Sequence, residues 1–152
     1  MQQLQNFKTK DQFLLLAEAG FIAINQSDED AAIKLFKASE LLDPDNLLPR
    51  IGMGYMHLCK LELKQAIKLF EEILTKDPHN EMARAFLGLS LSLNPAELTK
   101  GEKVLEEAAE KSKDPAIKNL AISALEFVEK FVKKTPSPVT ASPLEAKKKK
   151  KK

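Results

Sequence analysis

The chain has 152 residues, of which 43% are hydrophobic, with five glycines and one tyrosine. This length suits a single domain, and a sequence dominated by Ala, Leu, Glu and Lys predicts an all-α fold. The formal net charge of +2 depends on six lysines at residues 147–152, without which 18 basic and 22 acidic side chains remain. No aromatic residue and no basic helix face accompany this lysine run, so nucleic-acid binding is not expected.

Cysteine content and the N-terminal sequence indicate a reducing compartment. Cys59 is the one cysteine, which excludes a disulfide within the chain. The sequence MQQLQNFKTKDQF at the start lacks the basic segment and unbroken apolar stretch of a secretory signal. No stretch approaches 18 consecutive apolar residues, so no membrane span is expected. We therefore predict a cytoplasmic protein.

Three regions follow in chain order. Residues 1–11 form an N-terminal segment, and residues 12–134 form a helical domain with helices at about 12–25, 28–42, 47–60, 62–76, 80–93, 97–112 and 115–134. The last helix has an apolar stripe at three- and four-residue spacing and is predicted to cap the domain. Residues 135–152 contain three prolines, small polar residues and the lysine run, which predicts a disordered tail.

An internal repeat of 34 residues organises the helical domain. Residues 31–46 and 65–80 are identical at half of their sixteen positions. The period is kept by glycines, by prolines 24 residues after a glycine, by alanines 12 after it and by phenylalanines 16 after it: Gly20, Gly54, Gly88; Pro44, Pro78; Ala32, Ala66; Phe36, Phe70. We expect αα-hairpins in which the glycine meets the alanine and the phenylalanine fills the wedge between hairpins. The Asp-Pro step should end each second helix, and Asn46 and Asn80 should act as N-caps.

This pattern resembles the tetratricopeptide repeat (TPR), a 34-residue helix–turn–helix with small residues at two helix crossings and a closing proline. The resemblance covers residues 13–115 and is looser in the third repeat, which spans 27 rather than 24 residues from glycine to proline and keeps Gly88, Leu105, Ala108 and Pro115. We expect its extra residues in the Asn94-Pro95 turn and near Ser112. The aromatic residue usual early in the first helix is replaced by Leu16, Arg50 and Arg84. The resemblance implies a solenoid of three repeats plus the capping helix.

Catalytic constellations are not found. His57 and Cys59 are two residues apart on one predicted helix and point away from each other, so they cannot form a nucleophile–base pair. His79 falls in a turn, and the chain has no Cys/His spacing of the zinc type and no phosphate loop. We predict a protein that is not an enzyme and needs no metal or cofactor.

The TPR resemblance implies that the first helices line a concave groove. Its groove-facing positions lie at −6, −3, +1, +4 and +5 from each repeat glycine. They are Leu14, Ala17, Phe21, Ile24 and Asn25 in the first repeat, Leu48, Ile51, Tyr55, Leu58 and Cys59 in the second, and Met82, Ala85, Leu89, Ser92 and Leu93 in the third. None is charged, and all but Asn25 and Ser92 are apolar or aromatic. These side chains either bind an apolar partner or pack within the stack and against residues 1–11.

The groove does not match the carboxylate clamp of TPR co-chaperones, because Ala17, Phe21, Tyr55, Met82 and Phe86 stand where that clamp has Lys, Asn, Asn, Lys and Arg. An apolar groove suits an amphipathic helix of a partner protein. In size and groove character the chain resembles the small TPR chaperones of bacterial type III secretion. That resemblance implies a chaperone that prevents premature self-association of a secreted subunit, working in the smaller members with a second small co-chaperone. The alternatives are a general scaffold or adaptor, or a regulatory subunit of a larger complex.

Overall fold

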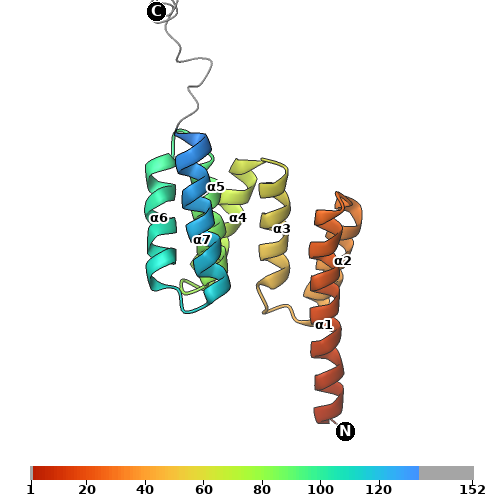
Figure 1. Ribbon diagram of the computed structural model, residues 1–152. Coiled ribbons are helices and arrows are strands. Elements are labelled where there is room, and N and C mark those ends of the chain that lie inside the picture. Colours follow the sequence, from red (N-terminus) through yellow and green to blue (C-terminus); the bar gives the residue numbers. More distant parts are fainter. Residues whose placement is uncertain (1, 134–152) are drawn as a thin grey trace, which may run out of the picture.

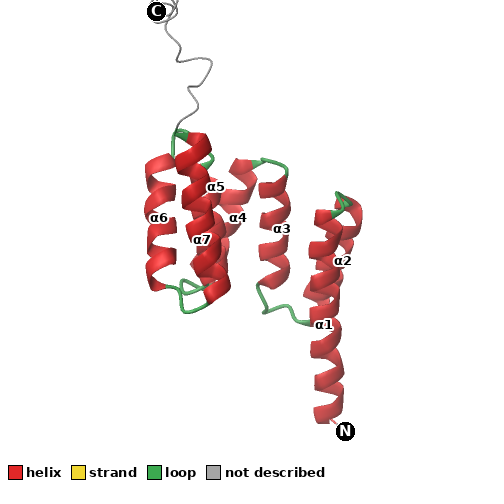
Figure 2. Ribbon diagram, viewed as in Figure 1, coloured by secondary structure: helices red, strands yellow, loops and turns green. Residues whose placement is uncertain are grey.

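The computed structural model describes residues 2–133, so the predicted tail at residues 135–152 lies outside the described residues. Within this range the secondary structure is helical throughout (Figure 2). The helices are α1 (Gln2–Asn25), α2 (Glu29–Leu42), α3 (Leu48–Cys59), α4 (Leu63–Lys76), α5 (Glu81–Ser92), α6 (Leu98–Lys111) and α7 (Pro115–Phe127), and a π-helical turn η1 (Val128–Val132) ends the described part.

The helices form three hairpins that stack in chain order (Figure 1). α1 packs on α2, α3 on α4, and α5 on α6, while α2 meets α3 and α4 meets α5 between hairpins. α7 packs against both α5 and α6 and so occupies the place of the first helix of a fourth repeat. This arrangement confirms the predicted all-α solenoid with a terminal helix.

Phenylalanines from the second helices hold neighbouring hairpins together. Phe36 and Phe70 are 1% and 0% exposed. A Cβ atom added at Gly54 would lie 2.7 Å from Cε1 of Phe70, and one added at Gly20 would lie 2.6 Å from Cε1 of Phe36. The atoms nearest these glycines therefore belong to the phenylalanine ring rather than to the alanine that we expected there. Phe36 also covers Gly52 of the next repeat, as the predicted wedge requires.

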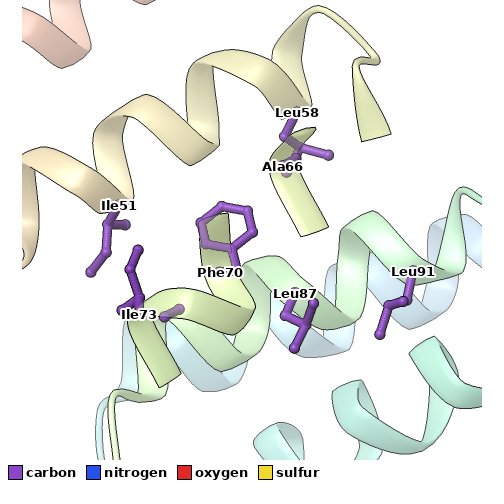
Figure 3. Packing of buried hydrophobic residues seen from close by; sticks show 8 residues of the cluster. Ile51, Leu58, Ala66, Phe70, Ile73, Leu87 and Leu91 are labelled. Atoms are coloured by element: carbon purple, nitrogen blue, oxygen red, sulfur yellow. The ribbon is translucent and has the colours of Figure 1, made fainter. Parts of the chain in front are cut away.

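The same wedge occurs between the second and third repeats. Figure 3 shows Phe70 of α4 between α3, which carries Ile51 and Leu58, and α5, which carries Leu87 and Leu91. All of these belong to one cluster of buried apolar side chains. Because the position of Gly52 is taken by Phe86 in the third repeat, the Phe70 ring stacks on Phe86 at 5.7 Å between centroids.

The third repeat keeps the design with one extra residue. α6 begins ten residues after Gly88, whereas α4 begins nine after Gly54, so the extra residue lies in the α5–α6 turn as predicted. Gly101 then takes the position of Ala66, and a Cβ atom there would lie 2.4 Å from the backbone nitrogen of Ser92. Leu105, which is fully buried, takes the position of Phe70. A smaller ring-free side chain is thus combined with a closer helix crossing.

Residues near Ser112 do not contain the further insertion that we predicted. α6 and α7 are joined by three residues, while α4 and α5 are joined by four. Pro115 is therefore not the closing proline of the third repeat. It is the first residue of α7, where its missing N–H leaves no hydrogen bond unmade, and Asp114 is the N-cap.

Asparagines cap the next helices in two different ways. Asn80 is the N-cap of α5 as predicted, and its Oδ1 accepts a hydrogen bond of 3.0 Å from the Ala83 N–H. Asn46 is not the N-cap of α3, which is Leu47. The residue three after Asn46 is Pro49, which has no N–H to donate, so Oδ1 of Asn46 accepts from the Leu48 N–H at 3.1 Å instead.

The N-terminal segment also differs from the prediction. α1 begins at Gln2, about ten residues earlier than expected, and runs on past the end of α2 (Figure 1). Residues 2–12 contain no glycine or proline that would stop a helix. This segment therefore continues α1 and does not fold back over the other first helices.

We expect Gly54→Leu to lower the free energy of unfolding by about 1–3 kcal/mol, because the fully buried Phe70 ring leaves no room for a side chain there. Thermal and denaturant unfolding would measure this. Combining it with Phe70→Ala should destabilise less than the sum of the two single changes, because the new leucine fills part of the space of the ring. Lys68→Leu on the exposed face of α4 is the control. Strict additivity in the pair would contradict the packing described.

The α3–α4 turn contains a strained residue that offers a second test. Leu61 has φ +57° and is 69% exposed, and Ser27 at the same place in the first repeat has φ +60°. Left-handed backbone disfavours a side chain, so Leu61→Gly should raise the free energy of unfolding by about 1 kcal/mol. Lys64→Gly, within the neighbouring helix, should instead lower it by about 1 kcal/mol. A loss of stability in Leu61→Gly would be inconsistent with this turn.

Candidate binding groove

The surface formed by α1, α3 and α5, here called the first-helix face, carries a row of aromatic rings. Phe21, Tyr55 and Phe86 come from the three first helices in turn. The ring centroids are 6.0 Å apart for Phe21 and Tyr55, and 5.2 Å for Tyr55 and Phe86. All three side chains are half-buried, so the row is both packed and open to contact on one side.

The wedge phenylalanines support this row from behind. Phe36 meets Phe21 edge-on at 5.2 Å, and Phe70 stacks on Phe86 at 5.7 Å. The residues that fix the spacing of the hairpins therefore also fix the spacing of the exposed rings. The row is rigidly held because both of these supporting side chains are buried.

The predicted groove residues divide into three groups by burial. Five pack within the stack: Ala17, Ile24, Ile51, Leu58 and Ala85. Six are half-buried: Phe21, Leu48, Tyr55, Met82, Leu89 and Leu93. Leu14 is 40% exposed. Internal packing, which the sequence left open, therefore accounts for the first group, and the other seven present surface to a partner.

Two hollows adjoin the first-helix face near the starts of α3 and α5. One, of about 560 Å³, is lined by Leu48, Ile51 and Met82 together with both Asp-Pro turns. The other, of about 310 Å³, is lined by Leu14 and Phe13 of α1 and by Leu42 at the end of α2. Asn46 lines both hollows. The positions six before each repeat glycine thus sit at adjoining depressions.

Phe86 is a groove residue that the sequence analysis omitted. It lies two residues before Gly88, at the position of Gly52 in the second repeat, so the repeat register did not select it. The spacing of Met82, Phe86, Leu89 and Leu93 would have found it, because steps of four, three and four residues share one helix face.

The face extends towards the end of the solenoid. Leu89 packs on the cluster between α3, α4 and α5 and also on the cluster that includes Ala121 and Leu125 of α7. α7 therefore borders the first-helix face beside α5. Its outer side remains partly apolar, with Ile122, Phe127 and Phe131 exposed.

The one polar group in the aromatic row is the Tyr55 hydroxyl. Its hydrogen bond with the Cys59 side chain, one helical turn later, raises the pKa of the phenol, and partial burial raises it further. Tyr55 is accordingly a neutral hydrogen-bonding group at physiological pH. Cys59 itself is exposed.

Groups suited to catalysis or metal binding do not gather on this face. His57 hydrogen-bonds through Nδ1 to Glu62 at 2.5 Å, in a network that also includes Lys60 and Glu29 and joins the α3–α4 turn to α2. Among residues 2–133, no group of three or more His, Cys, Asp or Glu side chains could hold a metal ion. None of the described helices is both long and apolar enough to cross a membrane.

Comparison with known proteins shows the fold. The chain is similar to the type III secretion translocator chaperone SycD of Yersinia enterocolitica, whose crystal structure (an alternative dimer) it matches with a TM-score of 0.61 at 24% identity, covering 78% of this chain and 92% of that chain. It is also similar to the uncharacterized protein ycf37 of Cyanophora paradoxa, at 29% identity over 76 residues. That match covers 50% of this chain and 44% of the relative, so it spans less than half of the relative's length. No family model matches the chain.

Tyr55 gives a direct spectroscopic test of this site. It is the one tyrosine in a chain without tryptophan, so absorbance of the phenolate reports on it alone. We expect its titration midpoint to lie above 10.0 and to move down towards that value in Cys59→Ala, which removes the largest cause of the shift. The phenolate should form only as the pH rises through the raised pKa. An unchanged midpoint in the variant would show that Cys59 does not act on Tyr55.

Proposed function

We propose that the protein binds an amphipathic helix of another protein on its first-helix face. The observation that carries the proposal is the uncharged aromatic row of Phe21, Tyr55 and Phe86. Half-buried rings without a neighbouring charge gain free energy by being covered with apolar side chains, at about 25 cal/mol per Å² of apolar surface removed from water. A helix supplies such a surface without leaving its own backbone groups unpaired.

The shape of the face also favours a helical guest. Helix-in-groove binding uses anchors spaced by three, four and seven residues. The hollows at Leu14 and at Leu48 and Met82 would receive two such anchors beside the ring row. Asp43, Asp45 and Asp77 line these hollows, together with Lys10 and Lys76. A guest with an apolar face flanked by charged residues of both signs would match this edge.

The biological role that we propose is that of a cytoplasmic chaperone for a secreted or assembling subunit. SycD, which shares the fold, is a type III secretion translocator chaperone, and this supports the role by analogy of fold. A subunit that polymerises through an apolar helix is kept apart when that helix is held in a groove. A scaffold or a regulatory subunit would use the same face to join components of a larger complex.

Binding can be measured with designed peptides that contain no tyrosine or tryptophan. We expect an amphipathic Leu/Ala/Lys helix of about 20 residues to change the Tyr55 fluorescence saturably, because it would cover the ring. A scrambled peptide of the same composition should bind at least about tenfold more weakly, since its apolar residues no longer share one face. Equal binding of the two peptides would contradict a helix-binding groove.

The variant Leu14→Asp/Leu48→Asp tests the location of the site. Both side chains line the hollows, and two carboxylates there should abolish peptide binding while far-UV circular dichroism stays the same. Leu61→Asp is the matched control, because it places the same charge on a leucine that is 69% exposed in the α3–α4 turn. If the control loses binding as well, the effect of the double variant is not local to the groove.

Copurification from the native host, followed by mass spectrometry, separates the candidate roles. A chaperone should carry a small helical subunit that polymerises when isolated and stays monomeric when the protein is added. Recovery of a large assembly, with no effect on polymerisation of any component, would instead indicate a scaffold.

A further inference from the structure

The outer side of the first hairpin is an open end of the solenoid. Leu15 and Ile22 of α1 are 66% and 56% exposed. Their equivalents one and two repeats later are buried against the preceding hairpin: Pro49 and Ala83 for Leu15, and Met56 and Ser90 for Ile22. The first repeat has no preceding hairpin, so side chains that belong to the interior of the repeat design are left on the surface.

A continuous exposed stripe runs along α1 on this side. Its described members recur every three or four residues and are all exposed: Lys8, Asp11, Leu15, Glu18 and Ile22. Beside it, Leu41 of α2 is 82% exposed. A mainly apolar hollow of about 470 Å³ lies between the two helices, lined by Gln12, Leu15, Leu16, Ala38, Leu41 and Leu42. Three- and four-residue steps are the seam of a helix that packs along another helix.

The start of α1 extends this stripe away from the domain. In Figure 1 α1 continues past the end of α2, with no other helix beside its first residues. A short helix without tertiary contacts is marginal in water, because nucleation is unfavourable and packing supplies most helix stability. Both the extension and the open hairpin side therefore need a covering element.

We propose that this element is a second copy of the chain, with the two α1 helices packed antiparallel about a two-fold axis. In the register that sets Glu18 opposite Lys8 of the second copy, Ile22 faces position 4, which is a leucine. The two-fold axis makes each of these pairs twice. Two ion pairs and two apolar pairs are thus produced by a single self-complementary stripe.

Charge favours a second copy over an unrelated apolar helix. Within residues 2–133, neither Lys8 nor Glu18 forms an ion pair in the isolated chain. A wholly apolar partner would leave Glu18 buried without a counter-charge, which is unfavourable. The stripe supplies the required lysine itself, ten residues before the glutamate.

One pair in this register is imperfect. Leu15 faces Asp11 of the second copy, and a carboxylate does not match an apolar side chain beside the Leu41 hollow. The interface should therefore be reversible, and replacing Asp11 with leucine should strengthen it. This expectation is specific to the proposed register, because a surface substitution elsewhere would not tighten association.

The test is sedimentation velocity of the full chain from about 1 to about 200 micromolar. We expect a concentration-dependent monomer–dimer equilibrium in the wild type. Leu15→Asp/Ile22→Asp should be monomeric throughout, with unchanged circular dichroism. Leu61→Asp, an exposed leucine away from α1, is the matched control and should dimerise normally.

The register is tested by charge reversal. Glu18→Lys should weaken dimerisation at least about tenfold, because two attractive pairs become repulsive. Adding Lys8→Glu to the same chain should restore it, and Asp11→Leu should tighten it beyond the wild type. A wild-type chain that stays monomeric overturns the proposal, as does a dimer unaffected by the Leu15/Ile22 variant. Failure of the Lys8→Glu rescue overturns the register. None of these outcomes depends on peptide binding at the first-helix face.

Discussion

The contact on which this structure depends is a phenylalanine ring against a helix that has no side chain at the point of contact. Phe36 covers Gly20 of its own hairpin and Gly52 of the next one, so it sets both the crossing within a hairpin and the step between hairpins. A ring in that place is possible because glycine leaves room, and glycine is tolerated inside these helices because the ring packing outweighs its poor helix propensity. Phe70 repeats the arrangement against Gly54 and then meets Phe86.

The exposed aromatic row is a consequence of that packing. Phe21 and Phe86 each rest on one of the wedge rings, and Tyr55 lies between them. The spacing of the rings that a partner would meet is therefore set in the core, and it does not depend on loops. In the third repeat Leu105 replaces the ring, and the helices come closer at Gly101. The row accordingly ends where the ring wedge ends.

The repeat design also explains where apolar surface remains. Each hairpin is built to be covered by the one before it, so the first hairpin has an apolar outer side that the chain does not cover. The first-helix face and this open end are different surfaces, formed by different sides of α1. Partner binding at the first and self-association at the second would each remove apolar surface from water without competing for the same residues.

The 34-residue spacing in the sequence by itself determined the number of hairpins, the wedge role of Phe36 and Phe70 and the cap at Asn80, because glycine, proline and ring positions constrain the backbone locally. Only the tertiary structure decided which apolar residues of the first helices stay accessible. Ala17, Ile51 and Ala85 are buried between neighbouring hairpins, and periodicity cannot distinguish such contacts from an open face. The extent of α1 and the place of Phe86 were likewise decided by tertiary packing, because both depend on what lies beside a helix and not on its own repeat register.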